Sequence, residues 1–117
     1  MNALPVSATA FSISEAVLDT RTIPESFLFL KDVPKFAYES VLRSPDEIAA
    51  VIGPDNPAAL MEHNGALVAG KTVLDAFDRL EVLEATAEAI IQSQPLGAIT
   101  PMNDSVIDEL LKAFGKV

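Results

Sequence analysis

The sequence predicts a mixed α/β fold with few strands and about four helices. The first observation is the Asn64-Gly65 pair, which separates two short apolar runs and is a strong signal for a β-hairpin. The second is a helical spacing of apolar residues over residues 72–93. The third is the composition, because half of the 117 residues are apolar and 21% are charged, as in globular chains. We therefore expect one domain, residues 1–117, with a single core.

The first third of the chain predicts a helix, an ambiguous element and a short strand. Residues 5–18 carry apolar side chains at helical spacing, so a helix lying on an apolar surface is expected. Residues 23–30 form an apolar run that is either a buried strand or a short helix beginning at Pro24. Residues 33–38 are β-prone, and Pro34 confines them to a strand start or an edge because it has no N–H.

Three helix-start signals agree at the next element. Ser44 is a cap residue, Pro45 suits the first helical position, and Glu47 is placed to return a hydrogen bond to the cap. A helix is therefore expected to about Ile52, and the Gly- and Pro-rich residues 53–57 then turn the chain.

The clearest local prediction is a β-hairpin in the middle of the chain. Residues 58–63 and 66–69 are the expected strands, and Asn64 and Gly65 are expected to take positive φ in the turn. Thus the hairpin fixes the centre of the expected sheet.

A long helix should follow the hairpin. Thr72 is the expected N-cap, with Asp75 three residues later, and the helix should run to about Ser93, before Pro95. Its expected apolar stripe consists of Val73, Phe77, Leu80, Leu83 or Glu84, Ala87 and Ile91.

The chain should close with a second amphipathic helix. After a loop over residues 95–102, Asn103 is the expected cap and Gly115 lies beyond the expected end. The expected apolar face consists of Val106, Ile107, Leu110, Leu111 and Phe114.

Charge and composition exclude several classes of function. A net charge of −9 repels phosphate backbones, so nucleic acid is not an expected partner. The absence of cysteine excludes disulfides and thiolate metal sites. No run approaches the ~18 apolar residues of a membrane span. Ala8-Thr9-Ala10 is similar to a signal-peptidase site, but no basic residue precedes Arg21, so the cytoplasm is the expected location.

His63, the single histidine, decides what metal chemistry one chain can perform. A three-histidine site is impossible within the chain. A site from His63 and Glu62 meets the difficulty that adjacent residues of a strand face opposite sides. His63 is thus either a polar strand residue just before the turn or a surviving functional residue, and we carry it forward as the candidate metal ligand.

Other polar features have structural interpretations. Gly65, Gly70 and Lys71 match neither of the two common glycine-rich phosphate motifs, so turn and helix-entry roles are favoured. No arrangement of a nucleophile with a base is indicated, and catalytic residues stay unknown. A solvated helix face, rather than a cation site, is the favoured interpretation of the acidic residues Asp75, Asp78, Glu81, Glu84 and Glu88.

Residues 57–84 contain Asn64-Gly65, an apolar run, Gly70-Lys71 and a helical segment rich in Leu and Glu. This order resembles the C-terminal hallmark of the class II aldolase/adducin family, in which an Asn-His-Gly hairpin precedes an apolar strand, a Gly-Lys pair and a helix. Residues 5–11 are similar to the helix after the family's His-x-His-Pro motif, residues 32–38 to its next strand, and residues 101–114 to its closing helix. The resemblance covers nearly the whole chain but only the C-terminal half of a usual family domain.

The resemblance implies a truncated three-layer α/β/α sandwich with a mixed, mostly antiparallel sheet. It also implies zinc-dependent cleavage or epimerisation of sugar phosphates, in which the metal polarises a carbonyl. The family's acid/base residues and phosphate loops belong to the N-terminal half, which this resemblance does not cover.

The metal-ligand positions implied by the resemblance are substituted. The His-x-His positions fall on Asn2 and Leu4, and the hairpin histidine falls on Asn64, one residue after His63. Only a slip of the hairpin by one residue would bring His63 to the ligand position, and such a slip reverses the face of a strand residue.

We therefore expect a catalytically impaired, adducin-like relative of the sugar-phosphate aldolases and epimerases. One alternative is an active metal-dependent aldolase whose site is completed by another subunit, with zinc as its cofactor; otherwise no cofactor is expected from this chain. The other alternative is a non-enzymatic acidic interaction module. A homo-oligomer, or a partner chain that completes the sheet, is expected because a half-length sheet leaves an exposed edge.

Overall fold

The computed structural model describes residues 1–114. It contains a four-stranded sheet in the order β1-β4-β3-β2. The strands are β1 (Asn2–Ala3), β2 (Lys35–Phe36), β3 (Ala58–Met61) and β4 (Ala66–Val68). The pairs β1–β4 and β3–β4 are antiparallel, and β2 lies parallel to β3. The sheet is therefore mixed and mostly antiparallel, with the hairpin at its centre and β2 at an edge as the sequence predicts.

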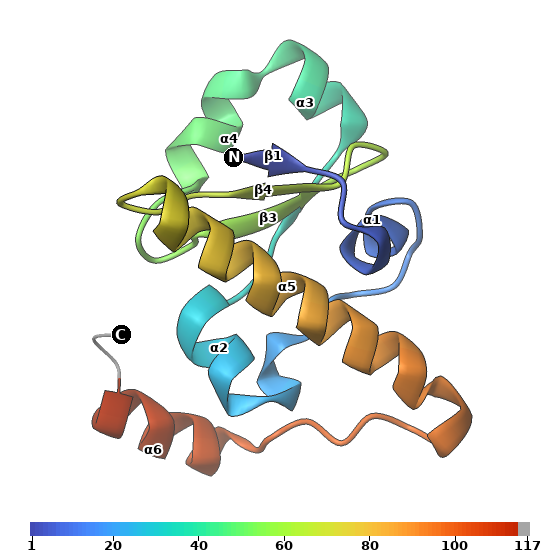
Figure 1. Cartoon of the computed structure of the whole chain (residues 1–117), viewed down its shortest axis with the longest axis vertical. Helices are drawn as coiled ribbons and strands as arrows, with labels where there is room; N and C mark the ends of the chain where they lie inside the picture. Colours follow the sequence, from blue (N-terminus) through green and yellow to red (C-terminus); the bar gives the residue numbers. More distant parts are fainter. Residues whose placement is uncertain (115–117) are drawn as a thin grey trace.

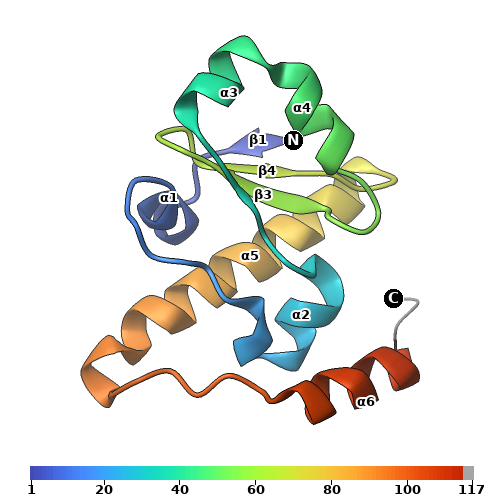
Figure 2. The same ribbon diagram turned by 180° about the vertical axis from the view of Figure 1, so that it is seen from behind.

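Helices cover both faces of this sheet (Figure 1). On one side lie α1 (Val6–Ser12), α2 (Pro24–Leu30), α5 (Val73–Ser93) and α6 (Asp104–Phe114). On the other side lie α3 (Tyr38–Arg43) and α4 (Pro45–Val51), and the view from behind shows the same order of layers (Figure 2). Two 3-10 turns, η1 (Thr20–Thr22) and η2 (Gln94–Leu96), complete the elements. The expected three-layer arrangement is confirmed.

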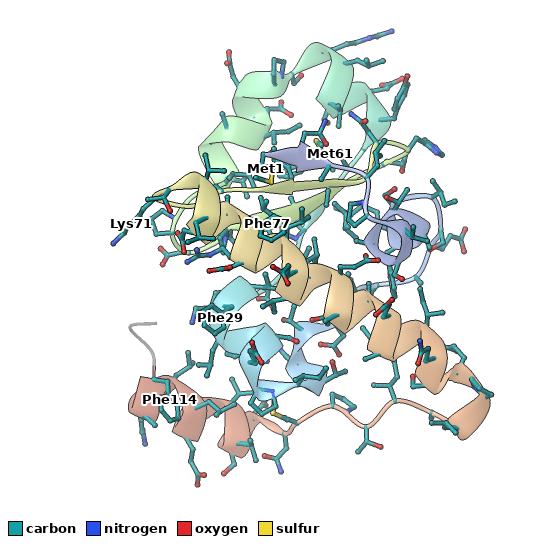
Figure 3. The ribbon with its side chains drawn as sticks, viewed as in Figure 1. Met1, Phe29, Met61, Lys71, Phe77 and Phe114 are labelled. Atoms are coloured by element: carbon teal, nitrogen blue, oxygen red, sulfur yellow. The ribbon has the colours of Figure 1, made fainter. Side chains whose placement is uncertain are left out.

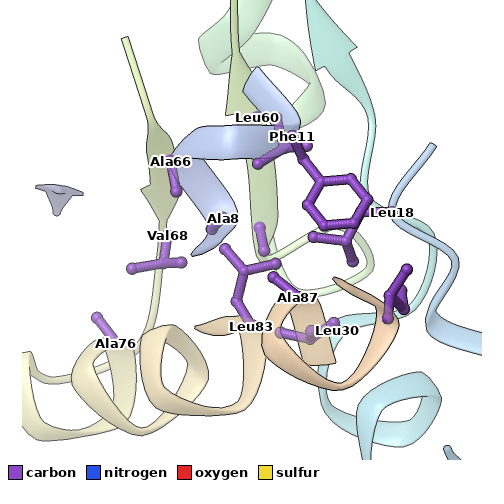
Figure 4. Packing of buried hydrophobic residues seen from close by; sticks show 12 residues of the cluster. Ala8, Phe11, Leu18, Leu30, Leu60, Ala66, Val68, Ala76, Leu83 and Ala87 are labelled. Carbon is purple, nitrogen blue, oxygen red and sulfur yellow. The ribbon is translucent and has the colours of Figure 1, made fainter. Parts of the chain in front are cut away.

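The main core lies between the sheet and the helices α1, α2 and α5 (Figure 4). Alternate residues of β3, Ala58 and Leu60, belong to it. Ala59 and Met61 are also buried and point to the opposite face, on the side of α3 and α4. The core cluster consists of Ala8, Phe11, Leu18, Leu30, Ala58, Leu60, Ala66, Val68, Ala76, Leu83, Ala87 and Ile90.

The helix α5 has the predicted bounds and cap, but its buried face is shifted. The Thr72 hydroxyl accepts a hydrogen bond from the Asp75 N–H at 3.0 Å. Val73, Phe77 and Ile91 of the expected stripe are exposed, at 76%, 46% and 41%. The buried residues are Ala76, Leu83, Thr86, Ala87 and Ile90. Leu83 and Ala87 of the expected stripe are therefore confirmed as buried, whereas Ala76, Thr86 and Ile90 are buried without having been expected.

The helix α1 ends at Ser12 rather than at Leu18, and the loop after it has a hydrogen-bond partner distant in sequence. The Lys35 ammonium donates to the Ser14 and Ala16 carbonyls, at 2.7 and 3.1 Å. Leu18 still reaches the core from the loop that follows. The predicted helix is therefore right in its position and too long.

The remaining helices resolve what the sequence left open. Residues 23–30 form a helix with Pro24 at its first position, not a strand. The helix α3 was not predicted. The helix α4 has the expected bounds, but the Ser44 side chain does not cap it; instead the Ser44 carbonyl accepts from the Glu47 N–H at 3.0 Å. The Ser44 N–H donates to the Ser40 carbonyl at 2.9 Å, so the expected returning bond from Glu47 is wrong.

The helix α6 has its predicted cap and an apolar face that is mostly exposed. The Asn103 side-chain oxygen accepts from the Val106 N–H at 2.9 Å. Of the expected apolar face only Ile107 is buried, and Leu111 and Phe114 are 40% and 54% exposed. Gly115 lies outside the described residues.

Two of the acidic residues expected to be solvated have structural partners. The Glu84 carboxylate accepts from the Ser7 and Ala8 N–H groups, at 2.9 and 2.8 Å, and so caps the start of α1 from the side of α5. The Asp75 carboxylate accepts from the Lys71 N–H at 2.9 Å and pairs with Arg79. For these two residues the prediction of a merely solvated face is wrong.

Replacing Glu84 by alanine should lower the free energy of unfolding by about 1 kcal/mol, the usual effect of losing a helix cap. The physical reason is that two N–H groups at the start of α1 lose their acceptor. Urea denaturation followed by circular dichroism measures the change. Glu88→Ala, an exposed change on the same helix, is the control and should have little effect; equal losses in the two variants would contradict the capping role.

Candidate functional site

The turn between β3 and β4 contains both His63, the candidate metal ligand, and Asn64, which occupies an expected ligand position. The Asn64 N–H donates to the Met61 carbonyl at 2.8 Å, and the Met61 N–H donates to the Gly65 carbonyl at 2.8 Å. Positive φ angles occur at His63 (62°) and Gly65 (75°). The prediction that Asn64 takes positive φ is therefore wrong, and His63 takes it instead.

This turn geometry places His63 outside the strand. The His63 Nε2 atom lies 3.7 Å from the Glu62 Oε1 atom. The expectation that the two side chains face opposite sides is wrong, because it assumed a strand that ends at residue 63, whereas β3 ends at Met61. His63 and Glu62 form an ion pair when the imidazole is protonated, with side chains 59% and 42% exposed.

Tyr38 at the start of α3 completes a small surface group at the turn. Its ring meets the His63 ring edge to face, with centroids 5.8 Å apart and planes at 75°. The Tyr38 N–H donates to the Glu62 carboxylate at 3.4 Å. Sequence reasoning missed Tyr38 because it stands 24 residues before Glu62, and no local motif links a helix start to a hairpin turn.

Ser12, at the end of α1, accepts two hydrogen bonds from the turn. The Ser12 carbonyl accepts from the His63 N–H at 3.1 Å, and the Ser12 hydroxyl accepts from the Gly65 N–H at 3.3 Å while it donates to the Thr9 carbonyl at 2.7 Å. A non-glycine residue with positive φ requires such surrounding contacts. They account for the backbone of His63 without any ligand.

Of the expected ligand positions in the N-terminal strand, Leu4 lies beside the hairpin turn. In the pairing of β1 with β4, Asn2 lies opposite Leu67 and Ala3 lies opposite Ala66. Leu4 is the residue that follows β1. A Cβ atom added at Gly65 would stand 2.4 Å from the Ala3 oxygen and 2.7 Å from the Leu4 Cδ2 atom. Leu4 is thus beside the hairpin turn that carries Asn64, and it is 67% exposed.

The residues at the turn do not fit a zinc centre. Zinc in a catalytic site takes three protein ligands from histidine, cysteine or carboxylate groups. The turn offers one imidazole and one carboxylate, at His63 and Glu62, beside the amide of Asn64 and the hydrocarbon side chain of Leu4. Within residues 1–114 no group of three histidine, cysteine or acidic residues is placed to hold a metal ion.

Gly70 and Lys71 lie at the entry to α5. A Cβ atom at Gly70 would stand 2.6 Å from the Ala76 backbone nitrogen and 2.7 Å from the Asp75 carboxylate, so only glycine fits there without displacement. The Lys71 side chain projects away from the body of the fold (Figure 3).

The pKa of the Asp75 carboxyl lies below its ordinary value of 3.8, chiefly because of the Lys71 N–H hydrogen bond and then because of Arg79. A carboxyl whose pKa is lowered by folding stabilises the fold above its unfolded pKa, and this stabilisation is lost as the pH falls through the folded pKa. Asp75→Asn should therefore be less stable than the parent at pH 7, and the difference should shrink below about pH 4. Urea denaturation at several pH values measures it, and a difference that stays constant across that range would contradict the prediction.

The sequence of this chain matches one known protein family over most of its length. The class II aldolase and adducin N-terminal domain family has a profile that matches residues 3–91. The chain belongs to this family. Asn2 lies just before the matched residues and α6 lies after them. No curated protein matches the chain.

Three solved structures share the fold. YgbL from Escherichia coli, a proposed aldolase/epimerase/decarboxylase, is 23% identical with a TM-score of 0.77, and 90% of this chain aligns with 53% of YgbL. YgbL from Klebsiella pneumoniae is 26% identical with a TM-score of 0.71 over the same shares, 90% and 53%. An aldolase II superfamily protein from Pseudomonas syringae is 19% identical with a TM-score of 0.75, and 100% of this chain aligns with 48% of it.

These likenesses confirm the class II aldolase-type fold. The chain spans about half the length of these relatives, 53% and 48% of them. Over residues 1–114 no helix is both long and apolar enough to cross a membrane.

Proposed function

We propose that this chain is a catalytically impaired member of the class II aldolase family, a relative of sugar-phosphate aldolases and epimerases retained for its fold. The observation that carries the proposal is the replacement of the expected metal ligands by Asn2, Leu4 and Asn64 in a chain that keeps the family fold. Adducin-type members give the precedent for a fold used in binding or structural roles, and fold alone does not imply activity.

The chemistry of the family explains why these substitutions matter. A metal ion that polarises a carbonyl must be held by lone-pair donors with a position left open for the substrate. Leu4 offers no donor atom, and the amides of Asn2 and Asn64 are poor zinc ligands beside histidine or thiolate. His63 is engaged instead with Tyr38 and Glu62 at the surface of the turn. No step of aldol cleavage is therefore assigned to this chain alone.

The proposed partner is a second copy or another chain that completes the sheet. Both edge strands, β1 and β2, are two residues long, and within residues 1–114 each has a neighbouring strand on one side only. Unpaired strand edges are commonly covered in proteins. The relatives are about twice as long, which supports an assembly in which further polypeptide extends this sheet. We propose the cytoplasm as the location.

An active enzyme is the second candidate. The proximity of Glu62 and His63, 3.7 Å apart and both partly exposed, leaves two potential ligands that a neighbouring subunit could complete. Such a site would use zinc and act on a sugar phosphate.

Metal content measured by elemental mass spectrometry, on protein purified without chelator, separates the two candidates. Light scattering on the same sample gives the mass of the assembly. We expect an oligomer with less than one-tenth of an equivalent of zinc, manganese or iron. Stoichiometric metal that is lost in His63→Asn would overturn the proposal and support the active enzyme. Stoichiometric metal kept in His63→Asn would also overturn it and place the ligands elsewhere.

A further inference from the structure

A groove runs along α5 on the side of α2. Its larger part, about 550 Å³, lies between α2 and α5, and its smaller part, about 270 Å³, lies between α5 and the segment around η2. Ile23 lines both parts, so they adjoin. In both views α2 lies beside α5, and the segment after η2 runs past the C-terminal half of α5 (Figures 1 and 2). We call the two parts together the α5 groove.

The two parts of the α5 groove differ in chemistry. The smaller part is lined mainly by apolar side chains, among them Ile90, Leu96 and Ile99. The larger part has apolar walls at Phe29 and Val82, and it carries the carboxylates of Glu25, Asp78 and Glu81. None of the described residues that line either part is a lysine or an arginine.

The floor of the larger part needs no polar ligand. Ser26 and Thr86 are 3% and 0% exposed, and their hydroxyl oxygens lie 2.6 Å apart. The Thr86 hydroxyl donates to the Val82 carbonyl at 2.6 Å. Because these hydroxyls bond to each other and to the helix backbone, polar recognition in the groove falls to the three carboxylates at its rim.

The carboxylates of the α5 groove indicate which kind of partner could bind there. A second copy of this chain carries 17 acidic and 8 basic residues, so its surface offers few cations to pair with an acidic groove. A partner with lysine or arginine side chains beside apolar ones matches both the charge and the apolar lining. The lining of α5 extends from Asp78 to Ser93, about 22 Å at 1.5 Å per residue, which suits about four turns of a partner helix.

We propose that the α5 groove binds a basic amphipathic segment of a partner protein. Apolar side chains of that segment lie against Ile23, Ile90 and Ile99, and its basic side chains pair with Glu25, Asp78 and Glu81. This interaction is independent of metal chemistry at the hairpin turn, since the groove and the turn share no lining residue.

The test uses the full chain and a fluorescein-labelled peptide of about 18 residues, made of Leu, Ala and Lys with the Lys residues toward one end. Fluorescence anisotropy gives Kd for the parent and for the triple variant Glu25→Gln/Asp78→Asn/Glu81→Gln. The control, Glu39→Gln/Glu47→Gln/Asp55→Asn, removes the same charge from exposed positions in α3, α4 and the turn that follows. We expect the groove variant to bind about tenfold more weakly, as for three partly screened ion pairs, and the control to bind less than twofold more weakly.

A pair of tryptophan variants tests the shape of the groove without changing its charge. Ala85 lines the larger part and is exposed, so Ala85→Trp should block binding, whereas Ala50→Trp on the exposed face of α4 should not. Circular dichroism shows whether each variant is folded. Equal weakening in the two triple variants, full binding in folded Ala85→Trp, or no binding of the peptide by the parent would each overturn the proposal.

Discussion

Replacing Leu83 by alanine should lower the free energy of unfolding by about 3 to 4 kcal/mol, within the range for large-to-small changes in a packed core. Leu83 is 0% exposed and lies in the middle of α5, where this helix faces the sheet and meets α1 and α2 (Figure 4). The surrounding alanines, Ala8 and Ala87, have no flexible side chains that could move into the space. The loss therefore includes both the transfer of the side chain and the cavity left behind.

Urea denaturation followed by circular dichroism measures this loss. Leu74→Ala is the matched control, because Leu74 belongs to the same helix and is 69% exposed. It should change the free energy of unfolding by less than about 0.5 kcal/mol. If the Leu83 variant lost less than about 1 kcal/mol, the packing of α5 on the sheet would not be as described.

Replacing Gly65 by alanine should cost about 3 kcal/mol or more, through two effects that act together. The φ angle of 75° is a left-handed conformation that L-residues with a Cβ rarely adopt. The added Cβ would also stand 2.4 Å from the Ala3 oxygen, which belongs to the backbone of β1 and cannot move alone. Relief of this overlap requires β1 to move away from β4, with loss of the pairing of Ala3 with Ala66.

Gly53→Ala provides the comparison for Gly65→Ala. Nothing lies within 4 Å of a Cβ added at Gly53, and its φ angle is outside the left-handed region. Thermal denaturation of both variants should show a large loss of Tm for Gly65→Ala and a small change for Gly53→Ala. Similar changes in the two variants would show that β1 does not lie against the turn.

Much of the fold could be predicted because several elements have start or turn signals within their own sequence. The hairpin follows from the turn residues between two apolar runs. The helix α5 begins at Val73, directly after its N-cap Thr72, whose hydroxyl accepts from the Asp75 N–H as the sequence spacing indicates. Pro24 at the first position of α2 is a helix-start signal, but the apolar run after it is equally compatible with a buried strand. Tertiary packing decided that element.

Errors arose where partners distant in sequence set the structure. The Ser7 and Ala8 N–H groups find their acceptor at Glu84, 77 and 76 residues away, so the helix spacing of α5 could not reveal a cap for α1. His63 rather than Asn64 takes the positive φ angle. This backbone is held by Ser12, which accepts hydrogen bonds from the His63 and Gly65 N–H groups. The approach of His63 to Glu62 and Tyr38 is a consequence of that turn, and strand periodicity could not predict it.

The candidate site itself was predicted chiefly through resemblance. Periodicity does not relate Asn2 and Leu4 to Asn64, which stands some sixty residues later in the chain. The structure brings Leu4 against the turn through the pairing of β1 with β4. We propose that these three residues occupy the positions of zinc ligands, and that their side chains are unable to bind the metal.

Restoring the ligands tests this proposal most directly. Zinc binding should be measured by equilibrium dialysis and elemental mass spectrometry, for the parent and for Asn2→His/Leu4→His/Asn64→His, with Asn2→Gln/Leu4→Met/Asn64→Gln as a control. We expect about one equivalent of zinc in the histidine variant and less than one-tenth in the parent and the control, since three imidazoles are a sufficient zinc ligand set. A folded histidine variant that binds no zinc, or a parent that binds one equivalent, would contradict it.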